Sequence, residues 1–157
     1  MFDKFMGLPM HPLLVHAVAV FVPLLVLAAL AYAFIPPLRA RVGWVAVLLA
    51  VAAPVSAFVT MKSGEALERR LIAKGYPPEG LRRISEHAEY GELTFWCSLG
   101  LALVTILLVA IGRRQGGGLL FALKLLLSVA IVGLSAAASV YVFLAGDTGA
   151  RMLWGNV

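Results

Sequence analysis

The sequence predicts an all-α integral membrane protein, a four-helix bundle whose helices run up-down-up-down. Of its 157 residues 62% are apolar and 13% are charged, with a mean hydropathy of +0.96, whereas soluble domains are roughly half apolar and about a quarter charged. The apolar residues form four runs, each near the ~20 residues that cross a bilayer. Short connections join runs one and two and runs three and four, so consecutive helices are antiparallel. We expect one transmembrane domain over residues 1–157.

The first two spans are expected at residues 13–35 and 42–61. The first contains His16 and Pro23 and stops at Pro36-Pro37, a pair that cannot continue a helix. The second carries Pro54, which a membrane helix tolerates because neighbouring groups satisfy the freed carbonyl.

A polar stretch at residues 62–92 follows, in which six Lys/Arg face six Glu around the break Gly75-Tyr76-Pro77-Pro78. This pattern predicts short amphipathic helices between spans two and three, lying against the end of the bundle. Glu86, Glu89 and Glu92 are interpreted as a solvated face, with a cation site shared with histidines as the alternative.

The third and fourth spans are expected at residues 93–111 and 119–145. The third ends at Arg113-Arg114, and the fourth ends before Gly146-Asp147-Thr148-Gly149, which is interpreted as a turn. Small residues occupy position 133 and positions 135–139 and let helix backbones approach closely. They predict the fourth helix as the central packing element, or alternatively a homo-oligomer face through Gly133 and Ala137.

The net charge of +5 fits loops beside lipid headgroups and does not suggest nucleic acid. Helix parity puts eight Lys/Arg on the side of the termini and four on the other, or five with Lys124. The larger count favours cytoplasmic termini, although the two short loops are purely basic and favour the reverse. The single cysteine, Cys97, excludes an intrachain disulfide.

The three histidines, His11, His16 and His87, all fall on one side of the membrane. Such groups near the hydrocarbon are functional-site candidates by default. His11 and His16 are about 140° apart on a regular helix, so they converge only if His11 lies off the helix, which Pro12 allows. Gly91, one turn after His87, leaves an open patch beside that imidazole. We predict that His16 and His87 face each other across spans one and three.

Two imidazoles on facing helices can hold haem iron in a bundle core. The sequence therefore favours a b-type haem bound by His16 and His87 beside Gly91, or a divalent metal ion bound by His11, His16 and His87. The corresponding function is electron transfer with a redox or respiratory membrane protein, rather than an enzyme in its own right. The alternative is a non-catalytic accessory or scaffold subunit of a larger membrane complex.

Residues 7–16, Gly-Leu-Pro-Met-His-Pro-Leu-Leu-Val-His, resemble the opening motif of the DUF2231 family of predicted four-span bacterial membrane proteins. That motif has a Pro, a His-Pro pair, aliphatic residues and a second His. His87 and the closing segment 145–154 are also similar to the family, whereas Ala17 departs from its usual bulky aromatic. The resemblance implies the bacterial inner membrane. Because some members carry a Rieske-type iron–sulfur domain after span four, it also implies a redox setting and a cytoplasmic C-terminus.

Overall fold

The computed structural model of the chain describes residues 4–5 and 8–155. Two short antiparallel strands, in which Lys4 pairs with Pro9 and Phe5 with Leu8, precede the helices. The strands are β1 (Lys4–Phe5) and β2 (Leu8–Pro9), and the helices are α1 (Met10–Phe34), η1 (Pro36–Leu38), α2 (Arg39–Ala73), α3 (Pro78–Gly112) and α4 (Gly118–Trp154).

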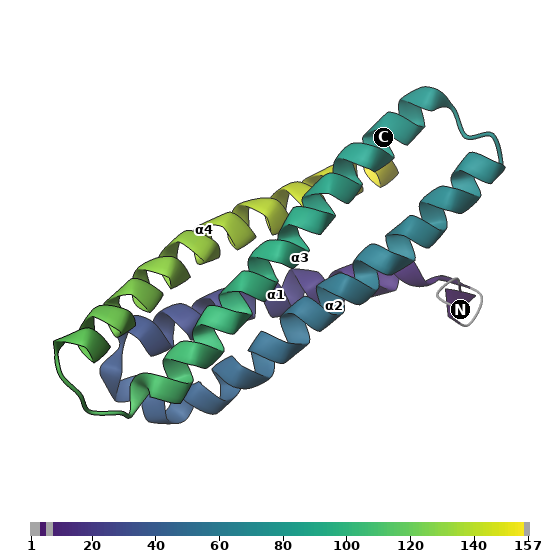
Figure 1. Cartoon of the computed structure of the whole chain (residues 1–157). Helices are drawn as coiled ribbons and strands as arrows, with labels where there is room; N and C mark the ends of the chain where they lie inside the picture. Colours follow the sequence, from purple (N-terminus) through teal and green to yellow (C-terminus); the bar gives the residue numbers. More distant parts are fainter. Residues whose placement is uncertain (1–3, 6–7, 156–157) are drawn as a thin grey trace.

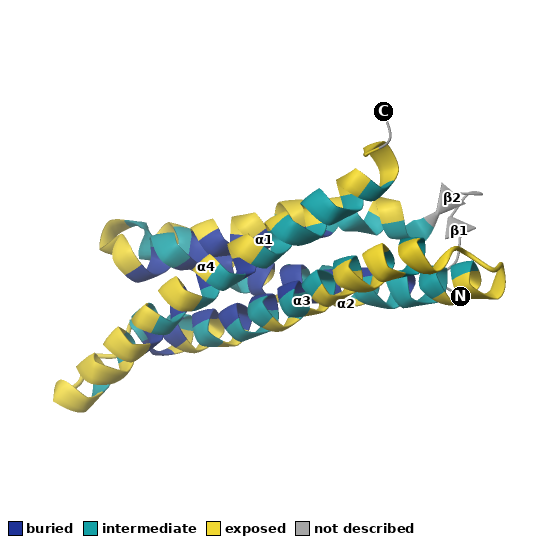
Figure 2. Cartoon of the chain, turned by 90° about the horizontal axis from the view of Figure 1, so that it is seen from above, coloured by how far each residue is buried: buried dark blue, intermediate teal, exposed yellow. Residues whose placement is uncertain are grey.

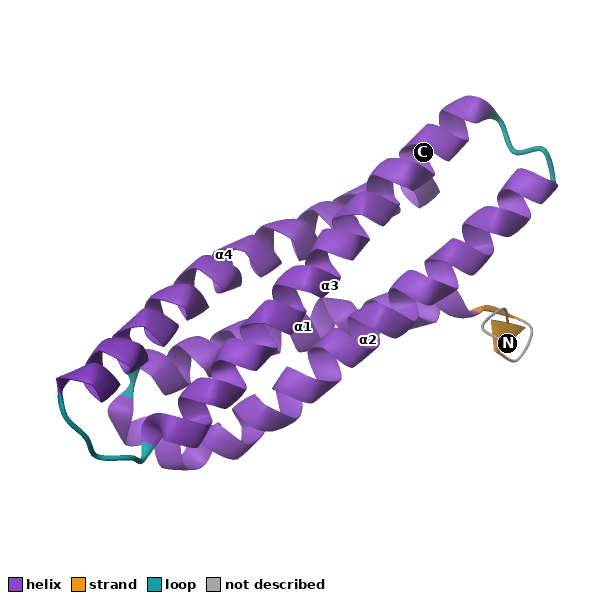
Figure 3. Cartoon of the chain, in the orientation of Figure 1, coloured by secondary structure: helices purple, strands orange, loops and turns teal. Residues whose placement is uncertain are grey.

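The long helices form the predicted up-down-up-down bundle (Figures 1 and 3). Helices α2 and α4 each pack against both α1 and α3, while α1 and α3 lie diagonally across the bundle. Helix α1 begins and α4 ends where α2 and α3 are joined (Figure 1). We call this the hairpin end, and the other end, which holds the α1–α2 and α3–α4 connections, the connection end.

Four helices in the described part of the chain are long and apolar enough to cross a membrane. Helices α2 and α3 have 35 residues each, or about 52 Å at the usual rise of 1.5 Å per residue. A hydrocarbon core is about 30 Å thick. The polar residues 62–73 and 78–92 are therefore helical, as predicted, but they continue α2 and α3 instead of forming separate short helices.

A tight turn joins these two extensions. Gly75 has a φ of +73°, and the Tyr76 N–H donates to the Leu71 carbonyl at 3.0 Å. A left-handed glycine followed by this hydrogen bond is a common helix terminus. Pro78 then starts α3, at a position where the missing N–H costs nothing.

Buried side chains are concentrated between the helices, most densely away from the α2–α3 turn (Figure 2). The apolar side chains of Val22, Leu25, Leu101 and Ile131 are fully buried. Tyr32 is also buried, 4% exposed, and its ring lies against Gly43 of α2 and Gly112 of α3. The connection end is thus closed by an aromatic ring between two glycines.

Cations from the following helix cap the C-termini of α1 and α3. Arg39 donates to the carbonyls of Tyr32 and Ala33 at 2.9 and 2.8 Å, and Lys124 donates to those of Gly112 and Arg114 at 3.1 and 2.8 Å. The last carbonyls of a helix have no partner within it, and Arg114 lies just past the end of α3, so the cations stabilise both helix ends.

Two predictions about α4 are wrong. It is not the central packing element, since 17% of its most apolar window is buried, against 33–39% in the other three spans. Leu127, Ile131, Ser135 and Ala138 face the core, whereas a Cβ at Gly133 would meet nothing within 4 Å. The Gly133 face is open, and self-association through it stays a prediction.

The helix also continues past Ala145 to Trp154, so residues 146–149 are not a turn. Thr148 donates its hydroxyl to the Leu144 carbonyl at 2.7 Å, and Arg151 pairs with Asp147 at 2.8 Å. Both contacts span one helical turn, which keeps this polar segment helical.

Candidate functional site

His11 and His87 meet in the interior of the bundle near the hairpin end. His11 lies in the first turn of α1 and His87 lies in α3, on the diagonally opposite helix. Their ring centroids are 5.9 Å apart and the ring planes are perpendicular. The expected meeting of two histidines from spans one and three therefore occurs, with His11 as the residue from span one.

The predicted pairing of His16 with His87 is wrong. His16 is exposed on α1, and its Nδ1 donates to the Pro12 carbonyl of its own helix at 2.7 Å. Because α1 begins at Met10, His11 is itself helical, and five helical positions separate the directions of the two side chains by about 140°. His11 points inward and His16 outward.

The hydrogen bonds of His11 fix its tautomer. Its Nδ1 lies 3.1 Å from both the Thr60 carbonyl and Ser63 Oγ. The carbonyl can only accept, and the Ser63 hydroxyl donates to that same carbonyl at 2.7 Å. Nδ1 must therefore carry the proton and donate to both oxygens, which leaves Nε2 unprotonated in the neutral ring.

His87 is held in the same way by α4. Its Nδ1 lies 3.1 Å from Thr148 Oγ1. The Thr148 hydroxyl donates its own proton to the Leu144 carbonyl. Nδ1 of His87 must then be the donor. The Ala145 carbonyl is a further acceptor for this imidazole, as the Thr60 carbonyl is for His11. With Nδ1 as the donor, Nε2 of each neutral ring carries a free lone pair.

Each imidazole also lies against a glycine of the neighbouring helix. A Cβ at Gly64 of α2 would lie 3.1 Å from Cε1 of His11, and a Cβ at Gly149 of α4 would lie 3.1 Å from Cε1 of His87. These distances are tighter than ordinary van der Waals contacts. Glycine at these two positions lets the rings approach the helix backbones.

A cavity of about 450 Å³ adjoins the pair and is lined by all four helices. Gly91 lines it, and a Cβ there would meet nothing within 4 Å, which agrees with the open patch expected beside His87. Thr60 also lines it, 8% exposed, and its Oγ1 has no hydrogen-bond partner. The walls are mainly small or aliphatic residues: Val15, Val18, Ala19, Ala57, Ala88, Val142, Ala145 and Gly146.

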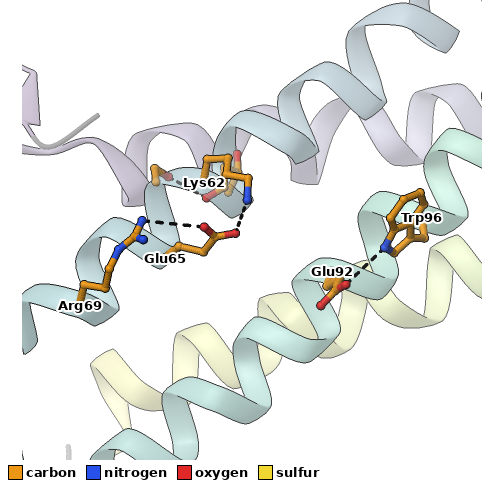
Figure 4. Close-up of polar contacts among 7 residues, drawn as sticks. Lys62, Glu65, Arg69, Glu92 and Trp96 are labelled. Atoms are coloured by element: carbon orange, nitrogen blue, oxygen red, sulfur yellow. Dashed lines mark hydrogen bonds and ion pairs between the residues drawn. The ribbon is translucent and has the colours of Figure 1, made fainter. Parts of the chain in front are cut away.

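Carboxylates from α2 and α3 line the same cavity. Glu65 forms an ion pair with Lys62 at 2.6 Å, and Glu92 accepts a hydrogen bond from Trp96 Nε1 at 3.4 Å (Figure 4). Glu89 lines the cavity as well. Lys62 lines the cavity too, so three carboxylates face one ammonium group. This excess of negative charge beside two free imidazole lone pairs favours a ligand that is positively charged or that donates hydrogen bonds.

The described residues hold no group of three or more His, Cys, Asp or Glu side chains that could bind a metal ion. The expected three-histidine metal site is therefore not assembled, because His16 points away. What the geometry provides is two ligands from opposite sides of the bundle.

A protein-family model described as "Predicted membrane protein (DUF2231)" matches residues 7–157. The chain belongs to this family. Gly7, where the resemblance at the N-terminus begins, lies outside the described residues, whereas His11, Pro12 and His16 of the same DUF2231 motif form the start of α1. No curated protein and no solved structure matches the chain.

Two dipeptides of this DUF2231 protein were not recognised as part of the site from sequence. Ser63-Gly64 holds His11 and Thr148-Gly149 holds His87. Each is a hydroxyl residue followed by glycine, about 50 to 60 positions after the histidine that it contacts. That repeated pattern is the signal that sequence analysis could have used.

Proposed function

We propose that this DUF2231 protein binds a b-type haem through His11 and His87 and transfers electrons within the membrane. The observation that carries the proposal is the pair of anchored imidazoles, each with Nδ1 bonded to a neighbouring helix and Nε2 free. Metal-binding histidines are held in this way, with the second nitrogen donating to a protein oxygen. Haem iron would supply one-electron chemistry at this position.

The two imidazoles lie close enough to share one bound centre, with ring centroids 5.9 Å apart. His11 and His87 would hold that centre through their Nε2 atoms, which carry free lone pairs. Small cavity-lining residues, including Gly91 and Gly146, give the pair a neighbouring space that a bound cofactor would occupy.

The remaining residues have supporting roles. Ser63 and Thr148 orient the imidazoles, and the carboxylates of Glu89 and Glu92 favour a positive centre. The Ser63 and Thr148 hydroxyls beside the imidazoles donate to backbone carbonyls and accept from Nδ1, so neither is arranged to give its proton to the imidazole as an activated nucleophile does. We therefore propose an electron carrier for a redox or respiratory partner and not an enzyme in its own right. A divalent metal ion held by the same two histidines is the second candidate cofactor.

Expression with a haem supply tests the proposal. The purified wild-type protein should show a Soret band and about one haem per chain. His11→Ala and His87→Ala should each abolish the band, and His16→Ala is the matched control, because His16 is exposed on the same helix as His11. Bound metal without a Soret band would replace haem by a metal ion. Neither haem nor metal in the wild type would overturn the proposal in favour of an accessory subunit.

We further propose that the protein lies in the bacterial inner membrane with both termini in the cytoplasm. The eight Lys/Arg on the side of the termini support this orientation. A reporter that is active only in the cytoplasm, fused after Val157, should be active. Activity of a periplasmic reporter at that position would instead show that the termini face the periplasm and that the two purely basic connections face the cytoplasm.

A further inference from the structure

The two helix hairpins of the chain repeat the same polar contacts at both ends. In the α1–α2 hairpin, a histidine early in the first helix is held by Ser63-Gly64 late in the second. In the α3–α4 hairpin, His87 is held by Thr148-Gly149. At the connection end Arg39 caps α1 and Lys124 caps α3.

These correspondences follow the packing of the bundle. Helices α1 and α3 occupy diagonal positions, and so do α2 and α4. A rotation of half a turn about the bundle axis therefore exchanges the two hairpins, and it exchanges His11 with His87. The spacing differs by nine residues: 53 positions separate His11 from Gly64, and 62 separate His87 from Gly149.

We infer that the hairpins are equivalent halves related by an approximate two-fold axis, and that Ser63 and Thr148 are equivalent positioning residues. Each fixes its imidazole as the Nδ1–H tautomer and leaves Nε2 free. A ligand between the rings then meets the same chemistry from both sides. Two equivalent nitrogens facing one ligand favour a single positive centre bound by both. This statement about the ligand rests on the proposed function.

Each positioning hydroxyl shares its imidazole with a backbone carbonyl of the same helix. His11 has the Thr60 carbonyl at 3.1 Å, and the Ala145 carbonyl is a hydrogen-bond acceptor for His87. Removing either hydroxyl therefore takes away one of two acceptors and should weaken the preference for the Nδ1–H tautomer. Thr148→Val, which keeps the shape of the side chain, and Ser63→Ala should act in the same direction.

The tautomers can be measured without any cofactor, by nitrogen-15 NMR of histidine-labelled protein in a His16→Ala background. Both remaining histidines should show a protonated Nδ1 and an unprotonated Nε2. Thr148→Val should give His87 a mixture of tautomers and weaken the binding of added haemin by about 10-fold or more. Thr148→Ser should restore both readouts. Ser128→Ala is the matched control, because that hydroxyl bonds only within α4, to the Lys124 carbonyl.

An Nε2–H tautomer at either histidine of the parent protein would overturn the inference, and so would an unchanged His87 tautomer in Thr148→Val. Circular dichroism checks that α4 stays helical in the variant. If the tautomers are as expected but the parent binds no haem or metal, the positioning role stands and the proposed function fails. The two statements are thus tested separately.

Discussion

The two ends of the bundle both place an aromatic ring of α1 against glycine, with opposite results. At the connection end, Tyr32 packs between Gly43 and Gly112, and its hydroxyl lies 3.5 Å from the Val109 carbonyl. At the hairpin end, His11 packs against Gly64 but borders a cavity of about 450 Å³. The first ring fills the core, and the second leaves part of it open.

The polar groups differ in the same sense. The cations at the connection end bond to the last carbonyls of α1 and α3. At the hairpin end, Nε2 of His11 and Nε2 of His87 keep free lone pairs beside the cavity. Buried hydroxyls without a partner do not distinguish the two ends, because they occur at Thr60, Thr105 and Ser135. We infer that the connection end contributes mainly to stability, and that the open cavity makes the hairpin end the candidate for binding.

The largest effect is expected from Gly112→Ala at the connection end. The added methyl group would overlap the Tyr32 hydroxyl, and overpacking a core costs roughly 1–3 kcal/mol. The free energy of unfolding in detergent should fall by that amount, with haemin binding unchanged. Gly117→Ala is the control, because its Cβ would meet nothing within 4 Å. Equal stability of the two variants would show that Tyr32 does not close this end.

Gly149→Ala applies the same change to the hairpin end. Its methyl group would lie 3.1 Å from Cε1 of His87 and would displace the imidazole into the cavity. We expect haemin affinity to fall about 10-fold, which equals about 1.4 kcal/mol, with a smaller change in stability than in Gly112→Ala. Gly133→Ala is the control on the same helix: its Cβ would meet no atom within 4 Å, it does not line the cavity, and it should bind normally. A loss of stability without a loss of affinity would make Gly149 a packing residue only.

Lys124→Met compares the polar contacts of the two ends. This variant leaves the Gly112 and Arg114 carbonyls without the Lys124 donor, and we expect it to lower the free energy of unfolding by about 1 kcal/mol. Lys62→Met is the counterpart at the hairpin end. Its ion pair with Glu65 joins side chains that are 42% and 41% exposed, so solvent screens it and the change should be near zero. A larger loss of stability in Lys62→Met than in Lys124→Met would show that the hairpin end, and not the connection end, contributes more to stability.

The sequence determined the number and order of the spans, because hydropathy reports directly how many helices can cross a bilayer. It also placed the histidines on one side, since helix parity depends only on that number. Which histidine points inward depends on the residue where α1 begins. A start at Leu13 would leave His11 outside the helix, whereas the helix begins at Met10.

Two further features could not be predicted from the sequence. One is the direction in which the small residues of α4 face, and the other is that the polar stretches continue α2 and α3. Gly133 could face either the core or the outside. Because α4 packs against α1 and α3 through another face, Gly133 lies on the outside. Residues such as Glu65 and Arg69, which pair one turn apart at 3.9 Å, suit a short helix and a long one equally. Ser63 and Thr148 were not predicted, because their role depends on contacts between helices.

The smallest effect is expected from cutting the α2–α3 turn. Lys74–Pro77 is exposed, and the helices on either side are continuous into the bundle. Trypsin should therefore cut first after Lys74, while Arg82 and Arg83 inside α3 are cut more slowly, because proteolysis needs locally unfolded chain. The cut chain should keep its haemin spectrum and nearly all of its stability, since Ser63 and His87 stay within intact helices. Rapid cutting after Arg82 and Arg83 would instead favour separate, loosely attached helices, and a spectrum lost with the first cut would make the turn part of the binding site.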